Sequence, residues 1–219
     1  LYDYAHTPWE WHKKIFLAAK KNNLSFFSSP FDESAVDFLE NIGCQAYKLA
    51  SPEITHIPLI EKISKTNKPV IISTGLASQK EIETALNILK KNNSKKIIVL
   101  KCSSSYPAQL DELNLKTMQD MKKRYKTLVG FSDHSIGSIA GITATVLGGS
   151  MLEKHFTHDE KKKSVDSFFS AGPKNFKDMV KQIREAEKSM GKINYQISKK
   201  SKISLNGRRS IYISQNVDR

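Results

Sequence analysis

Short β-rich runs recur along this sequence, and amphipathic stretches fill the spaces between them. The runs at 70–72 and 97–100 are apolar without interruption, which is typical of parallel strands buried on both faces. Residues 79–91 carry apolar side chains at helical spacing, as do other stretches between the runs, so the pattern predicts repeated βα units. Six strands are predicted, over residues 24–30, 46–51, 69–75, 96–103, 127–133 and 150–157.

Six consecutive βα units predict either a closed β/α barrel or a doubly wound open sheet. No G-x-G-x-x-G follows the first run, which argues against a dinucleotide-binding fold and favours the barrel. We therefore predict an α/β fold, a TIM (β/α)8 barrel over residues 1–194. It would lack its first two strands, because a closed barrel of this kind needs eight. Residues 195–207 are polar and Lys-rich and are predicted to be a linker, and 208–219 to begin a further domain with a strand at 208–214.

Composition excludes two classes of partner. The net charge of +13 comes from 30 Lys and only 5 Arg. Readers of nucleic acid favour the bidentate guanidinium of Arg, so no nucleic-acid partner is expected. No apolar run approaches the roughly 20 residues that span a bilayer, and the first residues lack the basic-then-apolar layout of a signal peptide, so a cytoplasmic protein without membrane contact is expected. Cys44 and Cys102 lie in apolar runs and are predicted to be reduced core residues.

Polar residues follow each predicted strand, where active sites of β/α barrels lie. Lys48 interrupts an apolar strand, and a buried ammonium needs an anion beside it. It is predicted either to bind a phosphate or carboxylate ligand or to pair with a buried carboxylate side chain. The Ser, Thr and Gly residues at 73–75 and 103–105 precede helices and would add hydroxyl and N–H donors for an anion.

Two histidines stand at the ends of adjacent predicted strands. His134 and His155, with Asp133 and Glu153 beside them, could converge on one divalent ion, although a lone strand-end histidine is more often structural. The remaining histidines are predicted to lie on the surface: His6, His12, His56 and His158.

The same strand-end motifs resemble, in order, those of the N-acetylneuraminate synthase family over nearly the whole chain. They are residues 27–32 (FSSPFD), 46–53 (AYKLASPE), 71–75 (IISTG), 102–107 (CSSSYP), 132–134 (SDH) and 153–157 (EKHFT). Within the family, 7–11 (TPWEW) and 165–170 (VDSFFS) resemble the pseudaminic acid synthase branch.

This resemblance implies a phosphoenolpyruvate-dependent transferase for bacterial surface glycans such as those of flagellin. Phosphoenolpyruvate would condense with 2,4-diacetamido-2,4,6-trideoxy-L-altrose, an N-acetylated amino sugar, to give pseudaminic acid and phosphate. The alternatives are a synthase of N-acetylneuraminate or legionaminate, and an inactive fragment of such an enzyme.

The resemblance also implies roles for individual residues. His134 and His155 would hold a divalent ion, Mn²⁺ or Mg²⁺, that polarises the sugar aldehyde. Catalytic roles would fall to Lys48, Glu53 and Tyr106, the last two facing the sugar with Asp166. The residues that would bind substrate are Ser29, Lys48, Ser51, Ser73, Gly75, Ser104, Ser132 and Asp166.

Three parts of the family pattern differ in this chain. The first two strands, with an acidic residue and a lysine of the site, are expected to be missing. Nearly all of the C-terminal antifreeze-like (SAF) domain, which in the family reaches the partner subunit of a homodimer, is also expected to be missing. A Gly-rich lead into the Asp166 segment is replaced by 161–164 (KKKS). The chain alone is therefore expected to be weakly active or inactive.

Overall fold

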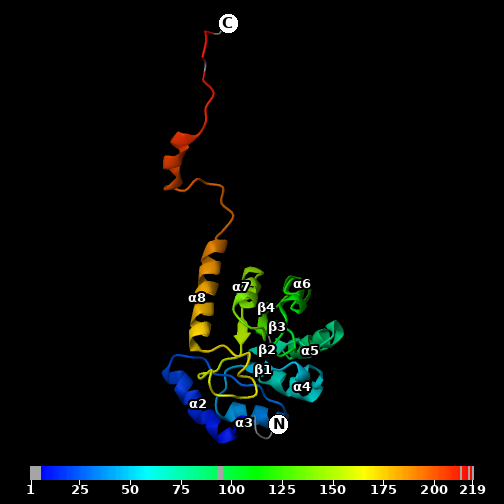
Figure 1. The fold of residues 1–219 in the computed structure, drawn as a ribbon. Coiled ribbons are helices and arrows are strands. Elements are labelled where there is room, and N and C mark those ends of the chain that lie inside the picture. Colours follow the sequence, from blue (N-terminus) through cyan, green and yellow to red (C-terminus); the bar gives the residue numbers. More distant parts are fainter. Residues whose placement is uncertain (1–5, 93–95, 213, 217, 219) are drawn as a thin grey trace. The chain divides into compact units, whose positions relative to one another are not determined.

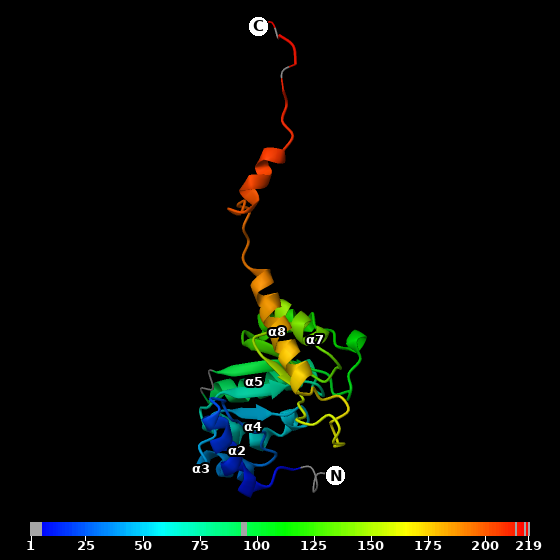
Figure 2. The same ribbon diagram turned by 60° about the vertical axis from the view of Figure 1, so that its left-hand side comes forward.

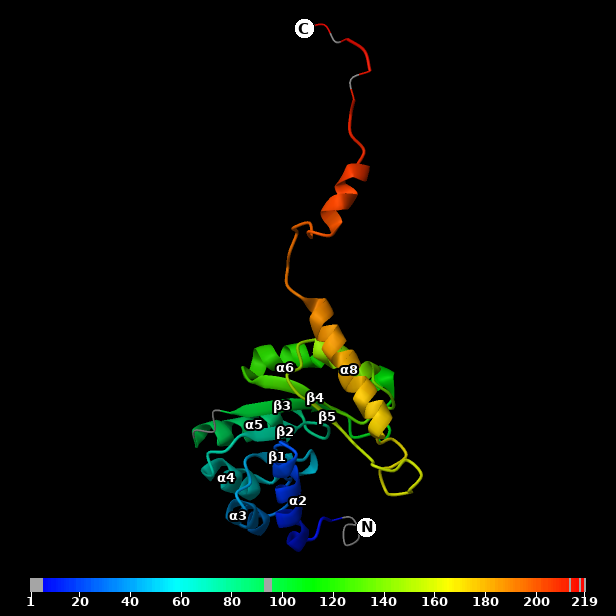
Figure 3. The same ribbon diagram turned by 90° about the vertical axis from the view of Figure 1, so that its left-hand side faces the viewer.

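A computed structural model of the chain describes residues 6–92, 96–212, 214–216 and 218. The chain forms two units, Leu1–Ser189 and Met190–Arg219. The first unit holds a parallel sheet whose five strands follow one another in chain order (Figures 2 and 3). The strands are β1 (Tyr47–Leu49), β2 (Val70–Ser73), β3 (Ile97–Cys102), β4 (Leu128–Asp133) and β5 (Leu152–Lys154).

Five of the six predicted strands are present, and each is shorter than its prediction. The first, predicted over 24–30, is reduced to a single parallel bridge between Ser28 and Tyr47. There the Lys48 N–H donates to the Ser28 carbonyl at 3.1 Å. Residues 24–30 thus lie beside β1 but do not form a strand.

The sheet is strongly curled. β1 and β5 are separated by three other strands, and in a flat sheet strands about 4.8 Å apart would hold them about 19 Å from each other. Lys48 of β1 and Glu153 of β5 nevertheless form an ion pair, with 3.4 Å between Nζ and Oε1. The strands therefore curve around a common interior, as the wall of a barrel does.

Helices pack against the outer side of this curved sheet (Figure 1). Neighbouring helices touch in chain order, α3 with α4 and α4 with α5, while α6 packs on β3 and β4 and α7 on β4 and β5. This single helical layer around a sequential parallel sheet is a TIM-barrel-like arrangement. The helices of the first unit are α2 (Trp9–Lys21), α3 (Glu33–Asn41), α4 (Ile57–Lys65), α5 (Gln79–Lys91), α6 (Thr117–Tyr125), α7 (Ile139–Val146) and α8 (Pro173–Met190, whose last residue begins the second unit), with short 3-10 helices η1 (Pro52–Thr55) and η2 (Leu110–Glu112). The second unit contains the 3-10 helix η3 (Ser201–Gly207).

Local sequence accounts for α5, whose bounds match the predicted helix at 79–91. Ser78 caps its first turn: the hydroxyl accepts from the Glu81 N–H, and the Glu81 carboxylate accepts from the Ser78 N–H. Four apolar side chains at helical spacing point into the core, and they are Ile82, Ala85, Leu86 and Leu89. Both cysteines, Cys44 and Cys102, are buried and free, as predicted.

The prediction that His12 lies on the surface is wrong. It is buried on the inner face of α2, with its ring edge-on to Phe38 at 5.3 Å between centroids. Trp9, one turn earlier, stacks on the same Phe38 at 4.5 Å. The His12 imidazole therefore packs in an aromatic cluster between α2 and α3. The residues next to His12 in the sequence do not predict this packing.

The predicted division at 195–207 and 208–219 stays a prediction. Residues 201–207 form η3 within the predicted linker. The predicted strand at 208–214 is absent from its described residues, which are in neither helix nor strand, and residue 213 lies outside the described part. A lone extended segment has no neighbour to satisfy its backbone groups. Across the described ranges, no helix has the length and apolar character needed to span a membrane.

Gly130 of β4 lies against Met151, the residue before β5. A Cβ added there would lie 2.4 Å from the Met151 carbonyl oxygen, which is held in place by the Phe131 N–H at 2.9 Å. Gly130→Ala is therefore expected to destabilise the fold by about 1–3 kcal/mol through overpacking, measured as a lower Tm in thermal unfolding. Gly207→Ala is the control, because a Cβ there meets nothing within 4 Å. An unchanged Tm for Gly130→Ala would contradict this close approach.

Candidate active site

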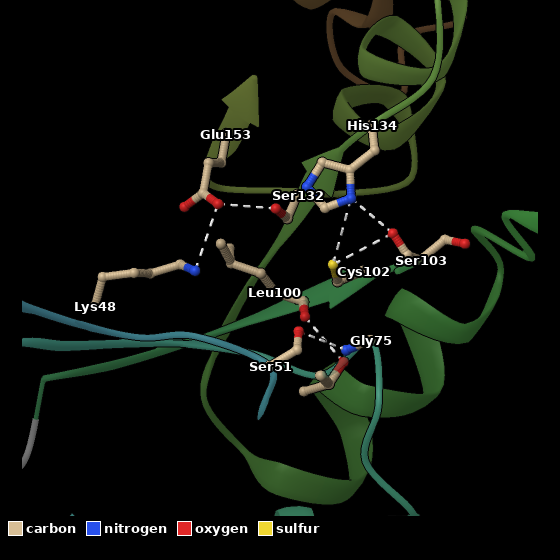
Figure 4. Close-up of polar contacts among 10 residues, drawn as sticks. Lys48, Ser51, Gly75, Leu100, Cys102, Ser103, Ser132, His134 and Glu153 are labelled. Carbon is tan, nitrogen blue, oxygen red and sulfur yellow. Dashed lines mark hydrogen bonds and ion pairs between the residues drawn. The ribbon is translucent and has the colours of Figure 1, made fainter. Parts of the chain in front are cut away.

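The ends of β1, β4 and β5 bring three polar side chains together on the inner face of the sheet (Figure 4). Glu153 Oε1 lies 3.4 Å from Lys48 Nζ and accepts a hydrogen bond from Ser132 Oγ at 2.9 Å. Ser132 and Glu153 are partners in the strand register, so their side chains share a face. Lys48 is only 7% exposed. Lys48 thus pairs with a carboxylate side chain, although Glu153 is 31% exposed and not buried as the second of the two predicted alternatives required.

A set of hydrogen-bonding groups lies at the ends of β1, β2 and β3, near Lys48. The Gly75 N–H donates to Ser51 Oγ at 3.0 Å (Figure 4), and a Cβ added at Gly75 would lie 2.4 Å from Ser104 Oγ. The Ser73 hydroxyl is buried without a hydrogen-bond partner among the described residues. A buried hydroxyl without a partner costs free energy, so this atom is available to a ligand.

The imidazoles of His134 and His155 lie edge to face, with 5.1 Å between ring centroids. His134 Nδ1 is 2.7 Å from the Ser103 carbonyl oxygen. Since a carbonyl only accepts, Nδ1 must carry the proton there, which leaves Nε2 for another contact. His155 Nδ1 faces Asp166 Oδ2 at 3.4 Å. Both rings are thus oriented through Nδ1 by an oxygen, an arrangement typical of metal-binding histidines.

The two imidazoles could supply two of the ligands of a metal ion, but not a complete set. In the described part of the chain, no group of three or more His, Cys, Asp or Glu side chains could hold a metal ion. Two imidazoles from adjacent strands would have to be joined by oxygen atoms of substrate or water. Mn²⁺ and Mg²⁺ accept such oxygen ligands, so the donor chemistry of the site suits either ion.

Aromatic side chains enclose the two imidazoles. The Tyr106 ring lies 4.4 Å from that of His134, and the Phe169 ring lies 4.7 Å from that of His155. Burial raises the pKa of Tyr106, and the negative charges of Cys102, Asp166 and Glu153 raise it further. The phenol therefore stays protonated and able to donate a hydrogen bond at neutral pH.

Asp166 reaches the site because the loop before α8 is closed at its base. The Ala171 N–H donates to the His155 carbonyl at 2.8 Å, and the Thr157 N–H donates to the Ala171 carbonyl at 3.1 Å. The loop between these contacts lines a cavity of about 600 Å³ that opens beside His155. Its lining residues are His155, Phe156, Thr157, His158, Lys162, Ser164, Val165, Asp166 and Ser170.

Ser29 lies apart from the two histidines. It lines a second cavity of about 430 Å³, on the side of the sheet edge next to residues 24–30, and this cavity also reaches Lys48 and Glu153. Of the predicted substrate residues, Ser29 and Lys48 line this second cavity, and Asp166 lines the cavity beside His155.

Glu53 is a predicted site residue whose carboxyl group is partly withdrawn from water. It lies in η1, and its Oε2 atom is buried without a hydrogen-bond partner among the described residues. Loss of solvation by burial raises the pKa of Glu53, against weaker opposing effects that include the charges of His56 and Lys48. The protonated form is therefore favoured more in the folded protein than in the unfolded chain.

This raised pKa predicts a pH-dependent cost in stability. Because the folded state holds the proton more tightly, Glu53 supports folding below its ordinary pKa of 4.5, and that support is lost as pH rises through the folded-state value. Glu53→Gln cannot ionise, so its Tm relative to wild type should rise from about pH 4 to about pH 7. Thermal unfolding over that range tests this, with the exposed Glu185→Gln as control. A Tm difference that is constant with pH would contradict the raised pKa.

Sequence reasoning missed Glu153 as the partner of Lys48 and Phe169 as a wall of the histidine pair. Strand alternation does place Glu153 on the face of His155, because it stands two residues earlier, but it does not identify Glu153 as the partner of Lys48. Phe169 carries no such signal, since it lies in a loop whose path depends on the closure at Ala171.

Known proteins resemble this chain over most of its length. Pseudaminic acid synthase of Helicobacter pylori is 40% identical over 201 residues, which are 92% of this chain and 59% of that protein. N,N'-diacetyllegionaminic acid synthase of Campylobacter jejuni is 44% identical over 182 residues, which are 82% of this chain and 54% of that protein. The chain thus spans less than two thirds of the length of these two relatives.

The fold is also that of a solved structure. The crystal structure of N-acetylneuraminic acid (sialic acid) synthetase from Leptospira borgpetersenii, in complex with citrate, aligns with a TM-score of 0.85 and 33% identity, covering 93% of this chain and 71% of that one. The family model described as the NeuB family matches residues 1–195. The chain belongs to the NeuB family, in agreement with the resemblance that its strand-end motifs indicated.

Proposed function

We propose that the protein is a nonulosonic acid synthase that joins phosphoenolpyruvate to an N-acetylated amino sugar. The observation that carries this is the juxtaposition, in a NeuB family chain, of a buried Lys48 ammonium and a pair of oriented imidazoles at the strand ends. The ammonium suits the phosphate and carboxylate of phosphoenolpyruvate, and the imidazoles suit a divalent ion. The relatives named above as synthases support the same reaction class.

In this proposal the phosphoenolpyruvate anion lies against Lys48. The buried Ser73 hydroxyl and the hydroxyls of Ser104 and Ser132 would supply further donors, as would the Ser51 hydroxyl, whose oxygen is held in place by the Gly75 N–H. Lys48 would turn from Glu153 to the ligand, because a phosphate carries more negative charge than the carboxylate. Holding both reactants in one orientation would supply much of the rate acceleration.

The divalent ion, when bound by His134 and His155, would supply Lewis-acid polarisation of the sugar aldehyde. C3 of phosphoenolpyruvate attacks that carbon, water adds at C2, and phosphate leaves by C–O cleavage. The protonated Tyr106 lies against His134 and can donate to the developing oxyanion. Glu53, with its raised pKa, is placed to exchange a proton near Lys48.

We propose pseudaminic acid as the product. Overall identity does not select it, since the pseudaminic and legionaminic acid synthases are 40% and 44% identical to the chain. The Ser167 hydroxyl bonds to the backbone of Ser164 and shapes the loop that presents Asp166 to the 600 Å³ cavity. Trp9, another marker of this branch, stacks on Phe38 and contributes packing. The Ser167 loop is therefore the stronger support for the choice of sugar.

Legionaminate or N-acetylneuraminate synthesis is the alternative, and an inactive fragment is a further one. We also propose that the complete protein is cytoplasmic, is homodimeric, and carries the remaining barrel strands and an antifreeze-like domain. The remaining strands would close the sheet between Ser28 and β5, where its edges are open in the described residues.

Phosphate release by the complete natural polypeptide tests the function. The enzyme is given phosphoenolpyruvate, Mn²⁺ and, in turn, the altrose derivative, N-acetylmannosamine and the legionaminate precursor. Release with the altrose derivative alone is expected. Release with another sugar would transfer the assignment to that synthase, and no release with any sugar would support the inactive fragment. The 219-residue chain alone is expected to be much slower, and a turnover rate equal to that of the complete protein would contradict its incompleteness.

A further inference from the structure

A buried ion pair joins β4 to β5 beside the two histidines. Lys154 Nζ lies 2.8 Å from Asp133 Oδ2; the Asp133 side chain is fully buried and that of Lys154 is 3% exposed. The two residues are partners in the strand register. Because successive strand residues point to opposite faces, this pair lies on the helix side of the sheet, away from Ser132 and Glu153.

Ser135 completes the network around the pair. Its N–H and its hydroxyl both donate to Asp133 Oδ1, at 2.8 Å and 2.6 Å, and its carbonyl accepts from Lys154 Nζ. Both carboxylate oxygens and the ammonium are therefore hydrogen-bonded. An ion pair withdrawn from water is tolerated only with such additional bonds, because desolvation otherwise outweighs the attraction between the charges.

Every member of this network is a chain neighbour of one of the two histidines. Asp133 and Ser135 are the residues on either side of His134, and Lys154 is the residue before His155. A slip of β5 by one residue against β4 would break the ion pair and turn the His155 ring to the other face. The pair thus fixes the register that brings the two rings to 5.1 Å.

We propose that Asp133 and Lys154 are positioning residues that hold the His134 and His155 imidazoles at the separation required by a shared divalent ion. The inference rests on the proposed metal-dependent function for the identity of its ligand. It goes beyond that function, because both side chains lie on the opposite face of the sheet from the reactants and act only through the backbone of the two histidines.

A double variant separates positioning from stability. Asp133→Asn with Lys154→Met, in the complete polypeptide, removes both charges and leaves no unpaired ion, so Tm should stay near that of wild type. Its Mn²⁺ dissociation constant, from the free Mn²⁺ signal in electron paramagnetic resonance, should rise about 10- to 100-fold. The matched control is Glu40→Gln with Lys68→Met, which neutralises an ion pair of α3 and should leave Mn²⁺ affinity unchanged.

Crystal structures of the metal-free wild type and double variant give a second readout, in which the ring separation should change by about 1 Å or more. An unchanged separation, or Mn²⁺ affinity equal to wild type, would overturn the inference. If the wild type does not bind Mn²⁺, the proposed metal dependence fails, and the ring separation alone decides the positioning role. Should the double variant not fold, Asp133→Asn with Lys154→Gln, which also removes both charges but keeps a polar side chain at each position, takes its place with the same readouts.

Discussion

Replacing His155 by Gln in the complete polypeptide is expected to lower kcat/KM for phosphate release by about 10³-fold while leaving the fold intact. The variant removes one of the two imidazoles proposed to bind the divalent ion, and with it the proposed Lewis-acid polarisation of the aldehyde. Losing one such electrostatic contribution costs about 10²- to 10³-fold or more in rate. The His155 side chain is 30% exposed, so its packing contribution is limited.

Steady-state phosphate release at saturating Mn²⁺ measures this loss, and circular dichroism at the assay temperature verifies the fold. His6→Gln is the control, since His6 is an exposed histidine that lines neither of the two cavities described above. Its activity should match that of wild type. If the activity of His155→Gln stayed within tenfold of wild type, His155 would not be a ligand of the proposed metal ion.

Much of the sheet could be predicted because its signal is local. The runs that became β2 and β3 are apolar on both faces, and that pattern alone marks central parallel strands. The first predicted strand, over 24–30, has similar β-rich composition yet contributes only the Ser28 bridge. Whether an edge segment forms a strand depends on neighbours on its open side, which its own sequence does not describe.

The contacts of the candidate site also fall into those that the sequence predicts and those that it does not. The meeting of His134 and His155 follows from their places at the ends of adjacent strands, which sequence order reveals. The pairing of Lys48 with Glu153 joins β1 to β5 and depends on how far the whole sheet curls. No residue near Lys48 encodes that curvature, so its partner could be predicted as a carboxylate but not identified.

Replacing Lys48 by Met is expected to raise the KM for phosphoenolpyruvate and lower kcat/KM by about 10²- to 10³-fold, with little change in the KM for the sugar. A buried ammonium that meets an anion contributes about 2–5 kcal/mol, and each 1.36 kcal/mol corresponds to a factor of ten. Met keeps the length and apolar stem of Lys, so the loss reports the charge. Glu153 remains partly solvated at 31% exposure and keeps its bond from Ser132, so the loss of stability should be modest.

Lys101→Met is the matched control for this change. Lys101 is half-buried in β3 next to Cys102, but strand alternation directs it to the opposite face from Cys102, and its Nζ donates to the Cys102 carbonyl at 2.9 Å. Burial lowers the pKa of Lys101, so this variant also removes a partly desolvated ammonium from the sheet. Equal increases in the KM for phosphoenolpyruvate in both variants would mean that general positive charge attracts the anion. An increase in the KM for phosphoenolpyruvate that is confined to Lys48→Met would mean that the anion binds at the inner face of the sheet. There it would contact the Lys48 ammonium, which pairs with Glu153 in the structure.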